Sequence, residues 1–134
     1  MTDQARRPLA ICATFTLPWP PSVNAAYRSI VIGRRPRVLI SREGREYKQA
    51  AAHALMLQRV PSFGDQRVSV SLSVYPPDRR KRDLGNLDKL LIDALMPQVI
   101  DDDSQIDKLT WERMRVIPGG EVTVTVAAIR PPGD

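Results

Sequence analysis

The sequence predicts a single α+β domain built from a mixed β-sheet and two main helices. Three observations lead to this fold class. The 134 residues match the length of one domain. Strand-like and helix-like segments follow in the order β-β-β-α-β-α-β-β, which favours α+β over a doubly wound sheet. No repeat, linker or low-complexity block divides the chain. We therefore interpret residues 1–134 as one domain, with residues 1–8 and 130–134 as flexible ends.

The first half of the chain predicts strands and a long helix. Residues 9–17 form an apolar strand that ends at a rigid proline-rich exit, Leu17-Pro18-Trp19-Pro20-Pro21-Ser22. Residues 29–32 and 37–40 predict a hairpin around the basic loop 33–36. Ser41 is a good N-cap, and Glu43 places negative charge in the first helical turn. The helix that follows continues to about residue 60, with apolar residues every three to four positions.

The second half predicts one clear strand, a second helix and a closing hairpin. Apolar residues alternate with serine over residues 68–74, which is typical of a strand with one buried face. From about residue 86 an apolar stripe predicts a helix that Pro97 ends. Residues 106–116 and 121–129 predict the hairpin, with Val122, Val124 and Val126 on its inner face. Because the first helix can join parallel strands, we expect the sheet to be mixed.

Composition indicates an ordinary soluble globular protein, since 43% of the residues are hydrophobic and 26% are charged. No apolar run approaches the roughly 18 residues that cross a membrane. Residues 1–8 carry Arg6 and Arg7 but lack the apolar core and the small-residue cleavage site of a signal peptide. The expected location is therefore the cytoplasm.

The scarcity of cysteine and histidine narrows the possible chemistry. Cys12 is the only cysteine and lies in the apolar first strand, so we expect a buried, inert thiol and not a nucleophile. His53 is the only histidine, and we interpret it as structural. Ser-His, Cys-His and multi-histidine zinc chemistry are thereby excluded. A hydrolase of this composition would use carboxylates and a hard metal ion.

The net charge of +5 is unevenly distributed. Residues 28–48 contain seven arginines and lysines against two glutamates, whereas residues 101–107 contain four aspartates. A second basic run covers residues 79–82. A basic surface with one acidic cluster indicates a polyanionic partner held around a metal site. Basic charge alone is a weak signal, because many basic proteins never contact nucleic acid.

Residues 77–89 and 101–106 carry the candidate chemistry. Asp83 precedes the second helix, Lys89 lies near its start, and Asp103 lies in the loop beyond it. Asp83 and Asp103 can meet only if that loop folds back along a helix about 17 Å long. Together they would offer Mg²⁺ hard oxygen ligands, and the ion would act on a phosphodiester. Lys89 would neutralise charge that develops on the phosphate, and residues 79–82 would hold flanking phosphates.

A structural interpretation of the same residues stays open. Asp103 can simply begin the last predicted hairpin, and Asp83 can satisfy a helix N-terminus. The arginines can form a solvated loop. The charge pattern alone favours this interpretation over the metal site.

The chain resembles the RusA family of Holliday junction resolvases, which are found largely in phages and prophages. One matching block is residues 17–22. The second covers residues 77–84 with Asn86, Leu87 and Lys89, and continues through residues 93–95 to residues 102–106. The resemblance covers nearly the whole chain, and the fixed internal spacing of the second block is specific.

The resemblance implies a RusA-like α+β homodimer that binds four-way DNA junctions by their structure and nicks two opposed strands with Mg²⁺ or Mn²⁺. A twofold dimer fits this activity, because two equivalent cuts need two equivalent sites. The family's catalytic aspartates match Asp83 and Asp103, with Asp102 adjacent as a further metal ligand. Its lysine matches Lys89.

The sequence departs from the family at one position. The family's motif Asp-Leu-Asp-Asn-Leu reads Asp83-Leu84-Gly85-Asn86-Leu87 here, so a metal-ligand position is vacated at Gly85. Residues i and i+2 of an extended segment face the same way, so the family's pair would present two carboxylates to one ion. Three explanations are open: a lineage with weakened or lost cleavage, a deliberate or accidental change in this sequence, or compensation by Asp88 or Asp101. We expect impaired catalysis with DNA binding kept.

Three hypotheses for the function follow. The first is a structure-selective endodeoxyribonuclease that resolves four-way junctions in DNA recombination and repair, with Asp83, Asp103 and Lys89 as catalytic residues. Its expected DNA contacts are Arg79, Arg80, Lys81, Arg82, Arg28, Arg34 and Arg35. The second is a catalytically disabled junction-binding protein of the same fold. The third is an interaction module whose basic face meets a protein or RNA, which equal affinity for duplex and four-way DNA would favour.

Overall fold

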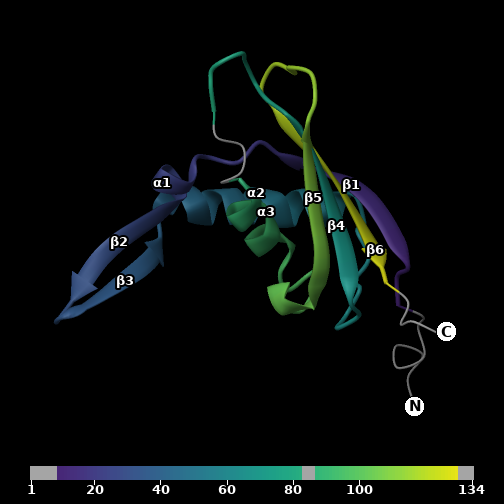
Figure 1. Ribbon diagram of the computed structural model, residues 1–134, viewed down its shortest axis with the longest axis horizontal. Coiled ribbons are helices and arrows are strands. Elements are labelled where there is room, and N and C mark those ends of the chain that lie inside the picture. Colours follow the sequence, from purple (N-terminus) through teal and green to yellow (C-terminus); the bar gives the residue numbers. More distant parts are fainter. Residues whose placement is uncertain (1–8, 83–86, 130–134) are drawn as a thin grey trace.

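Four strands form the main sheet of the computed structural model, in the order β1-β6-β4-β5 (Figure 1). They are β1 (Cys12–Pro18), β4 (Val68–Tyr75), β5 (Ile106–Arg113) and β6 (Glu121–Ala128). The structure describes residues 9–82 and 87–129, except for the side chains of residues 23, 24, 28 and 30. β6 is antiparallel to both of its neighbours, whereas β4 and β5 run parallel. The sheet is therefore mixed, as predicted.

Two main helices, α2 (Arg42–Leu57) and α3 (Asp88–Leu95), pack with this sheet around one hydrophobic cluster. Every second residue of β4, from Val68 to Val74, is buried. On α2 the buried aromatic and aliphatic side chains are Tyr47, Ala51 and Leu55, which recur at helical spacing. Buried residues thus recur at every second position of the strand and about every 3.6 positions of the helix, and the two elements were predicted from these periods. The α+β fold class is confirmed.

The predicted hairpin between residues 106–116 and 121–129 is wrong. β5 pairs in parallel with β4, and β6 lies on the other side of β4, between β4 and β1. A parallel pair needs a crossover connection, and α3 supplies it between β4 and β5. The parallel strands are therefore joined by the second helix and not by the first, from which the mixed sheet was inferred. Alternating residues identify a strand but not the strand beside it.

A separate two-stranded sheet projects from the body and is called the arm here (Figure 1). It consists of β2 (Tyr27–Ile32) and β3 (Arg35–Ile40), and the short helix α1 (Val23–Ala26) leads into it. The strands are antiparallel, so the predicted hairpin is confirmed. Its turn is tighter than predicted, with only Gly33 and Arg34 between the strands, and Gly33 has a φ of +64° that favours glycine.

Ser41 and Gly44 fix the base of the arm against α2. The Ser41 hydroxyl donates to the Ala25 carbonyl at 2.5 Å and accepts the Gly44 N–H at 3.1 Å, which confirms Ser41 as the N-cap. A Cβ at Gly44 would lie only 2.5 Å from the Ala26 carbonyl oxygen. Glycine therefore allows the helix to approach the backbone that enters the arm.

Cys12 is exposed, so the prediction of a buried thiol is wrong. β1 is an edge strand on which Phe15 and Leu17 are buried, while Cys12 and Thr14 lie on the opposite face. His53 is also exposed, on α2. The flexible ends that we predicted, residues 1–8 and 130–134, lie outside the described residues. None of the helices within residues 9–82 and 87–129 has the length and apolar character that a membrane span requires.

Candidate functional site

A hollow of about 390 Å³ lies along α3 and β5. It is lined by three aspartates, one lysine and three aliphatic residues: Asp88, Lys89, Ile92, Asp93, Asp103, Ile106 and Leu109. α3 contributes the first four, the short 3₁₀ helix η3 (Asp103–Gln105) the fifth, and β5 the last two. The β4–α3–β5 crossover creates this arrangement, because it packs the helix beside the strand that follows it.

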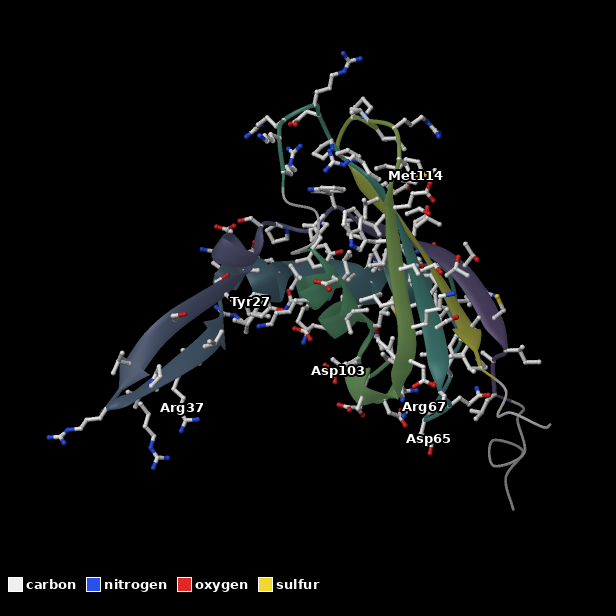
Figure 2. All side chains as sticks on the ribbon, viewed as in Figure 1. Tyr27, Arg37, Asp65, Arg67, Asp103 and Met114 are labelled. Atoms are coloured by element: carbon white, nitrogen blue, oxygen red, sulfur yellow. The ribbon has the colours of Figure 1, made fainter. Side chains whose placement is uncertain are left out.

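Two of the three predicted catalytic residues, Lys89 and Asp103, line this hollow together. Asp103 is exposed at the start of η3, where Figure 2 shows it beside the lower end of β5. Asp88 also lines the hollow, whereas Asp101 is not among the lining residues. Asp83 and Gly85 lie outside the described residues. The pairing of Asp83 with Asp103 therefore stays a prediction.

A buried glutamine holds the loop that carries Asp103. Gln105 is 5% exposed. Its side-chain oxygen accepts the N–H groups of Asp101 and Asp102, both at 2.9 Å. Its amide nitrogen donates to the carbonyls of Gly64 and Gln66 at 2.8 and 2.7 Å. One side chain thus satisfies four backbone groups and ties the acidic loop to the turn before β4.

Asp102, the further metal ligand that we predicted, caps η3. Its carboxylate accepts the N–H of Ser104 at 3.0 Å and also accepts the Ser104 hydroxyl. These hydrogen bonds stabilise the charged form and lower the pKa of Asp102. Asp102 and Gln105 form a capping box. Their spacing, Asp-x-x-Gln, is a sequence signature of this cap, although the cap was not predicted.

Substitution of Gln105 by methionine is expected to lower the free energy of unfolding by about 2–4 kcal/mol, because it leaves buried backbone groups without partners. Methionine has a similar length but makes none of the four hydrogen bonds. Urea unfolding followed by tryptophan fluorescence measures the change. Gln98→Met is the matched control, since Gln98 is exposed in the turn after α3. Equal stability of the two variants would contradict the anchoring role.

Asp78 organises the basic loop that follows β4. Its carboxylate accepts Arg82 Nη1 at 2.7 Å and the N–H of Arg80 at 2.8 Å. These two hydrogen bonds, the Arg82 bond first, lower the pKa of Asp78 to about 2. Arg82 is half-buried, whereas Arg79, Arg80 and Lys81 are exposed. Three of the four DNA contacts predicted in this loop therefore project into solvent, and the hydrogen bond of Arg82 to Asp78 stabilises the loop.

The basic loop and Asp103 lie at opposite ends of the parallel pair. The loop follows the end of β4, while Asp103 precedes the start of β5, which pairs with the start of β4. Strands of eight residues separate the two ends by about 26 Å. A polyanion that contacts both must therefore be an extended molecule.

The strands of the arm carry their charged residues on one face only. Cross-strand partners of an antiparallel pair project to the same side, and the sides alternate along each strand. By this register Arg35 and Arg37 share one face. The other face carries only uncharged residues: Tyr27, Ser29, Val31, Pro36, Val38 and Ile40. Arg34 is exposed in the turn, and the side chain of Arg28, another predicted contact, lies outside the description.

Tyr27 lies at the base of the arm (Figure 2). It contacts Asp93 and Lys89, two residues that line the hollow. Its hydroxyl donates to Asp93 Oδ2 at 2.5 Å, and its ring centroid lies 4.2 Å from Lys89 Nζ. Burial and the neighbouring Asp93 carboxylate raise the pKa of Tyr27 above its ordinary value. These contacts could not be predicted, because no local sequence pattern links a strand residue to a helix this far along the chain.

Comparisons with known proteins converge on one family. A family model described as Endodeoxyribonuclease RusA matches residues 18–127. The crossover junction endodeoxyribonuclease RusA of Escherichia coli strain K12 is 34% identical over 114 residues, which cover 84% of this chain and 92% of that protein. The protein of the same name from Enterobacteria phage 82 is 36% identical over 112 residues (83% and 90%). That from Enterobacteria phage HK97 is 29% identical over 116 residues (86% and 93%).

Proposed function

The chain belongs to the RusA family of endodeoxyribonucleases, and from this premise we propose that it is a structure-selective endodeoxyribonuclease that resolves four-way DNA junctions in recombination and repair. The observation that carries the proposal is the hollow in which Lys89 and Asp103 lie together. We propose further that residues 1–134 form one nuclease domain and that the protein acts in the cytoplasm.

The donor atoms of the hollow suit a hard divalent cation. Its lining offers carboxylate oxygens from Asp88, Asp93 and Asp103 and contains neither sulfur nor imidazole. Within residues 9–82 and 87–129 no three potential ligands converge on one point, so the proposed site requires Asp83 in addition. We propose that Asp83 and Asp103 hold Mg²⁺ or Mn²⁺, with Asp102 adjacent. When bound, such an ion would polarise the scissile phosphodiester and stabilise the leaving oxygen.

The protein's own groups would bind and orient the DNA. Lys89 presents an ammonium group at the hollow, where it can neutralise charge that develops on the phosphate. The exposed cations of the basic loop and of the arm would bind phosphates away from the cut, with an affinity that falls as salt rises. The distance between the basic loop and Asp103 suits a branched duplex that lies along the sheet. Arg82 would contribute by shaping the loop.

We propose that the active form is a homodimer. Symmetric cuts in two opposed strands need two equivalent sites related by a twofold axis. The uncharged face of the arm supports the proposal, because Val31 and Val38 on that face are 70% and 62% exposed. Projecting apolar side chains of this kind suit a protein partner, while the arginines on the other face suit DNA.

The test compares binding and cleavage of a synthetic four-way junction and a matched duplex, in Mg²⁺ and in Ca²⁺. The proposal predicts preferential binding of the junction with either ion and paired nicks with Mg²⁺ alone. A plasmid with an extruded cruciform tests the dimer, since two coordinated cuts give a linear product and single cuts give a nicked circle. Equal affinity for duplex and junction would contradict the proposal.

A second candidate function, a junction-binding protein without cleavage, is favoured by Gly85. Loss of one carboxylate weakens the hold on a cation but removes no group that binds phosphate. In the same assays this candidate predicts preferential junction binding with intact DNA strands at every Mg²⁺ concentration. Cleavage at the rate of an uncompromised relative would exclude it.

A further inference from the structure

We propose that Tyr27 and Asp93 are positioning residues that hold the ammonium group of Lys89 at the hollow and thereby couple the arm to the site of cleavage. The inference rests on the proposed function, in which Lys89 acts on the scissile phosphate. It gives a functional role to Tyr27, the first residue of β2, and to Asp93 on α3. The hydrogen bond and the ring contact described above carry the inference.

The ring of Tyr27 restricts where the ammonium group can lie. Lys89 Nζ is 4.2 Å from the ring centroid, within the roughly 6 Å over which a cation is attracted to an aromatic face. A lysine side chain is otherwise flexible, and Lys89 is exposed. Displacement of a catalytic group by about 1 Å can lower the rate 10²-fold, so a restraint on the position of the ammonium group raises the rate of cleavage.

Asp93 fixes the ring in turn. It lies four residues after Lys89 on α3 and lines the same hollow. Its carboxylate accepts the Tyr27 hydroxyl at 2.5 Å, which sets the orientation of the ring under the ammonium group of Lys89. The Tyr27 hydroxyl is a donor at neutral pH, and burial together with Asp93 raises its pKa further above its ordinary value. The aspartate thus acts through the tyrosine, and the tyrosine acts on the lysine.

The arrangement links DNA binding by the arm to the position of Lys89. Tyr27 is the first residue of β2, which leads to the turn at Gly33 and Arg34. β3 then returns the chain to Ser41, whose hydroxyl donates a hydrogen bond to the Ala25 carbonyl at the base of the arm. The element proposed to bind phosphates therefore also carries the ring that places the lysine. A shift of the arm at its base would move the ring and the ammonium group with it.

A direct test of the placement uses NMR of the protein labelled at lysine. Aromatic rings shift nuclei above their faces upfield, so the Lys89 ε-methylene protons should resonate upfield of the other lysines. Tyr27→Phe keeps the ring and should keep most of the shift, whereas Tyr27→Leu should abolish it. Tyr75→Leu is the matched control, because Tyr75 lies under another cation, Arg115, at 5.3 Å and outside the hollow.

Single-turnover nicking of a four-way junction tests the functional consequence, in the Gly85→Asp background if the parent is too slow. We expect Tyr27→Leu to lower the maximal rate by about 10-fold with unchanged junction affinity, and Tyr27→Phe to lower it less. Tyr27→Leu combined with Lys89→Ala should be no slower than Lys89→Ala alone, since the ring acts only through the lysine. A general structural role for Tyr27 would instead make the two losses multiply.

The outcomes separate this inference from the proposed function. An unshifted Lys89 resonance, or losses that multiply in the double variant, would overturn the positioning role whatever the parent's activity. If the upfield shift is present but no variant cuts any junction, the placement stands and the proposed cleavage fails. Urea unfolding of each variant verifies that a lower rate does not reflect lost folding.

Discussion

Replacement of Asp103 by asparagine is expected to reduce junction nicking by roughly 10²–10³-fold, the range for removal of one group that stabilises a transition state. Asparagine preserves the volume but removes the negative charge that a hard cation requires from its ligand. Asp103 is exposed, so the folded state should tolerate the change. The affinity for the junction, measured in Ca²⁺, should stay the same or rise, because one charge that repels phosphate is lost.

Asp101→Asn is the matched control for this prediction. Asp101 belongs to the same exposed acidic run, but its side chain is not part of the hollow. Its nicking rate should remain close to that of the parent. If both variants lose activity equally, the acidic residues contribute through their total charge, and the prediction of a specific role for Asp103 is wrong. If neither loses activity, the site lies elsewhere.

The elements of this fold could be predicted because their signals are local. The alternation over residues 68–74 and the apolar stripe on the second helix each depend on neighbours within a few positions, and both are buried as expected. Long-range contacts decide which edge of β4 the strand β5 occupies. The sequence of residues 106–116 contains no signal that predicts this edge. The exposure of Cys12 has the same origin, because an apolar edge strand does not reveal which face the helices cover.

The site could be predicted to a similar extent. Asp103 and Lys89 were identified by resemblance and by charge pattern, and the crossover that brings them to one hollow follows from the parallel pairing of β4 and β5. The anchoring role of Gln105 was available from its spacing to Asp102 but was not predicted. The contact of Tyr27 with Asp93 spans 66 positions, and only the folded arrangement of the arm on α3 creates it.

Introduction of an aspartate at position 85, Gly85→Asp, is expected to raise the nicking rate by about 10²-fold if the parent lacks a metal ligand, comparable to the loss caused by removing one stabilising group. Residues 83–86 connect the basic loop directly to Leu87 and Asp88, and Asp88 lines the hollow. A second carboxylate in this segment would strengthen the hold on the cation. Single-turnover rates over a series of Mg²⁺ concentrations measure the gain and should show half-saturation at lower Mg²⁺.

Asp88 determines how large that gain can be. Of the two residues that could compensate for Gly85, Asp88 lines the hollow and Asp101 does not, so Asp88 is the better candidate. If Asp88 already supplies the missing carboxylate, Asp88→Asn abolishes nicking in the parent, and Gly85→Asp restores it. If nothing compensates, Asp88→Asn leaves a slow parent unchanged, and Gly85→Asp accelerates both backgrounds equally. Tight junction binding with no acceleration in either background would mean that an aspartate at position 85 does not bind a cation in this protein. The metal site would then consist of other residues.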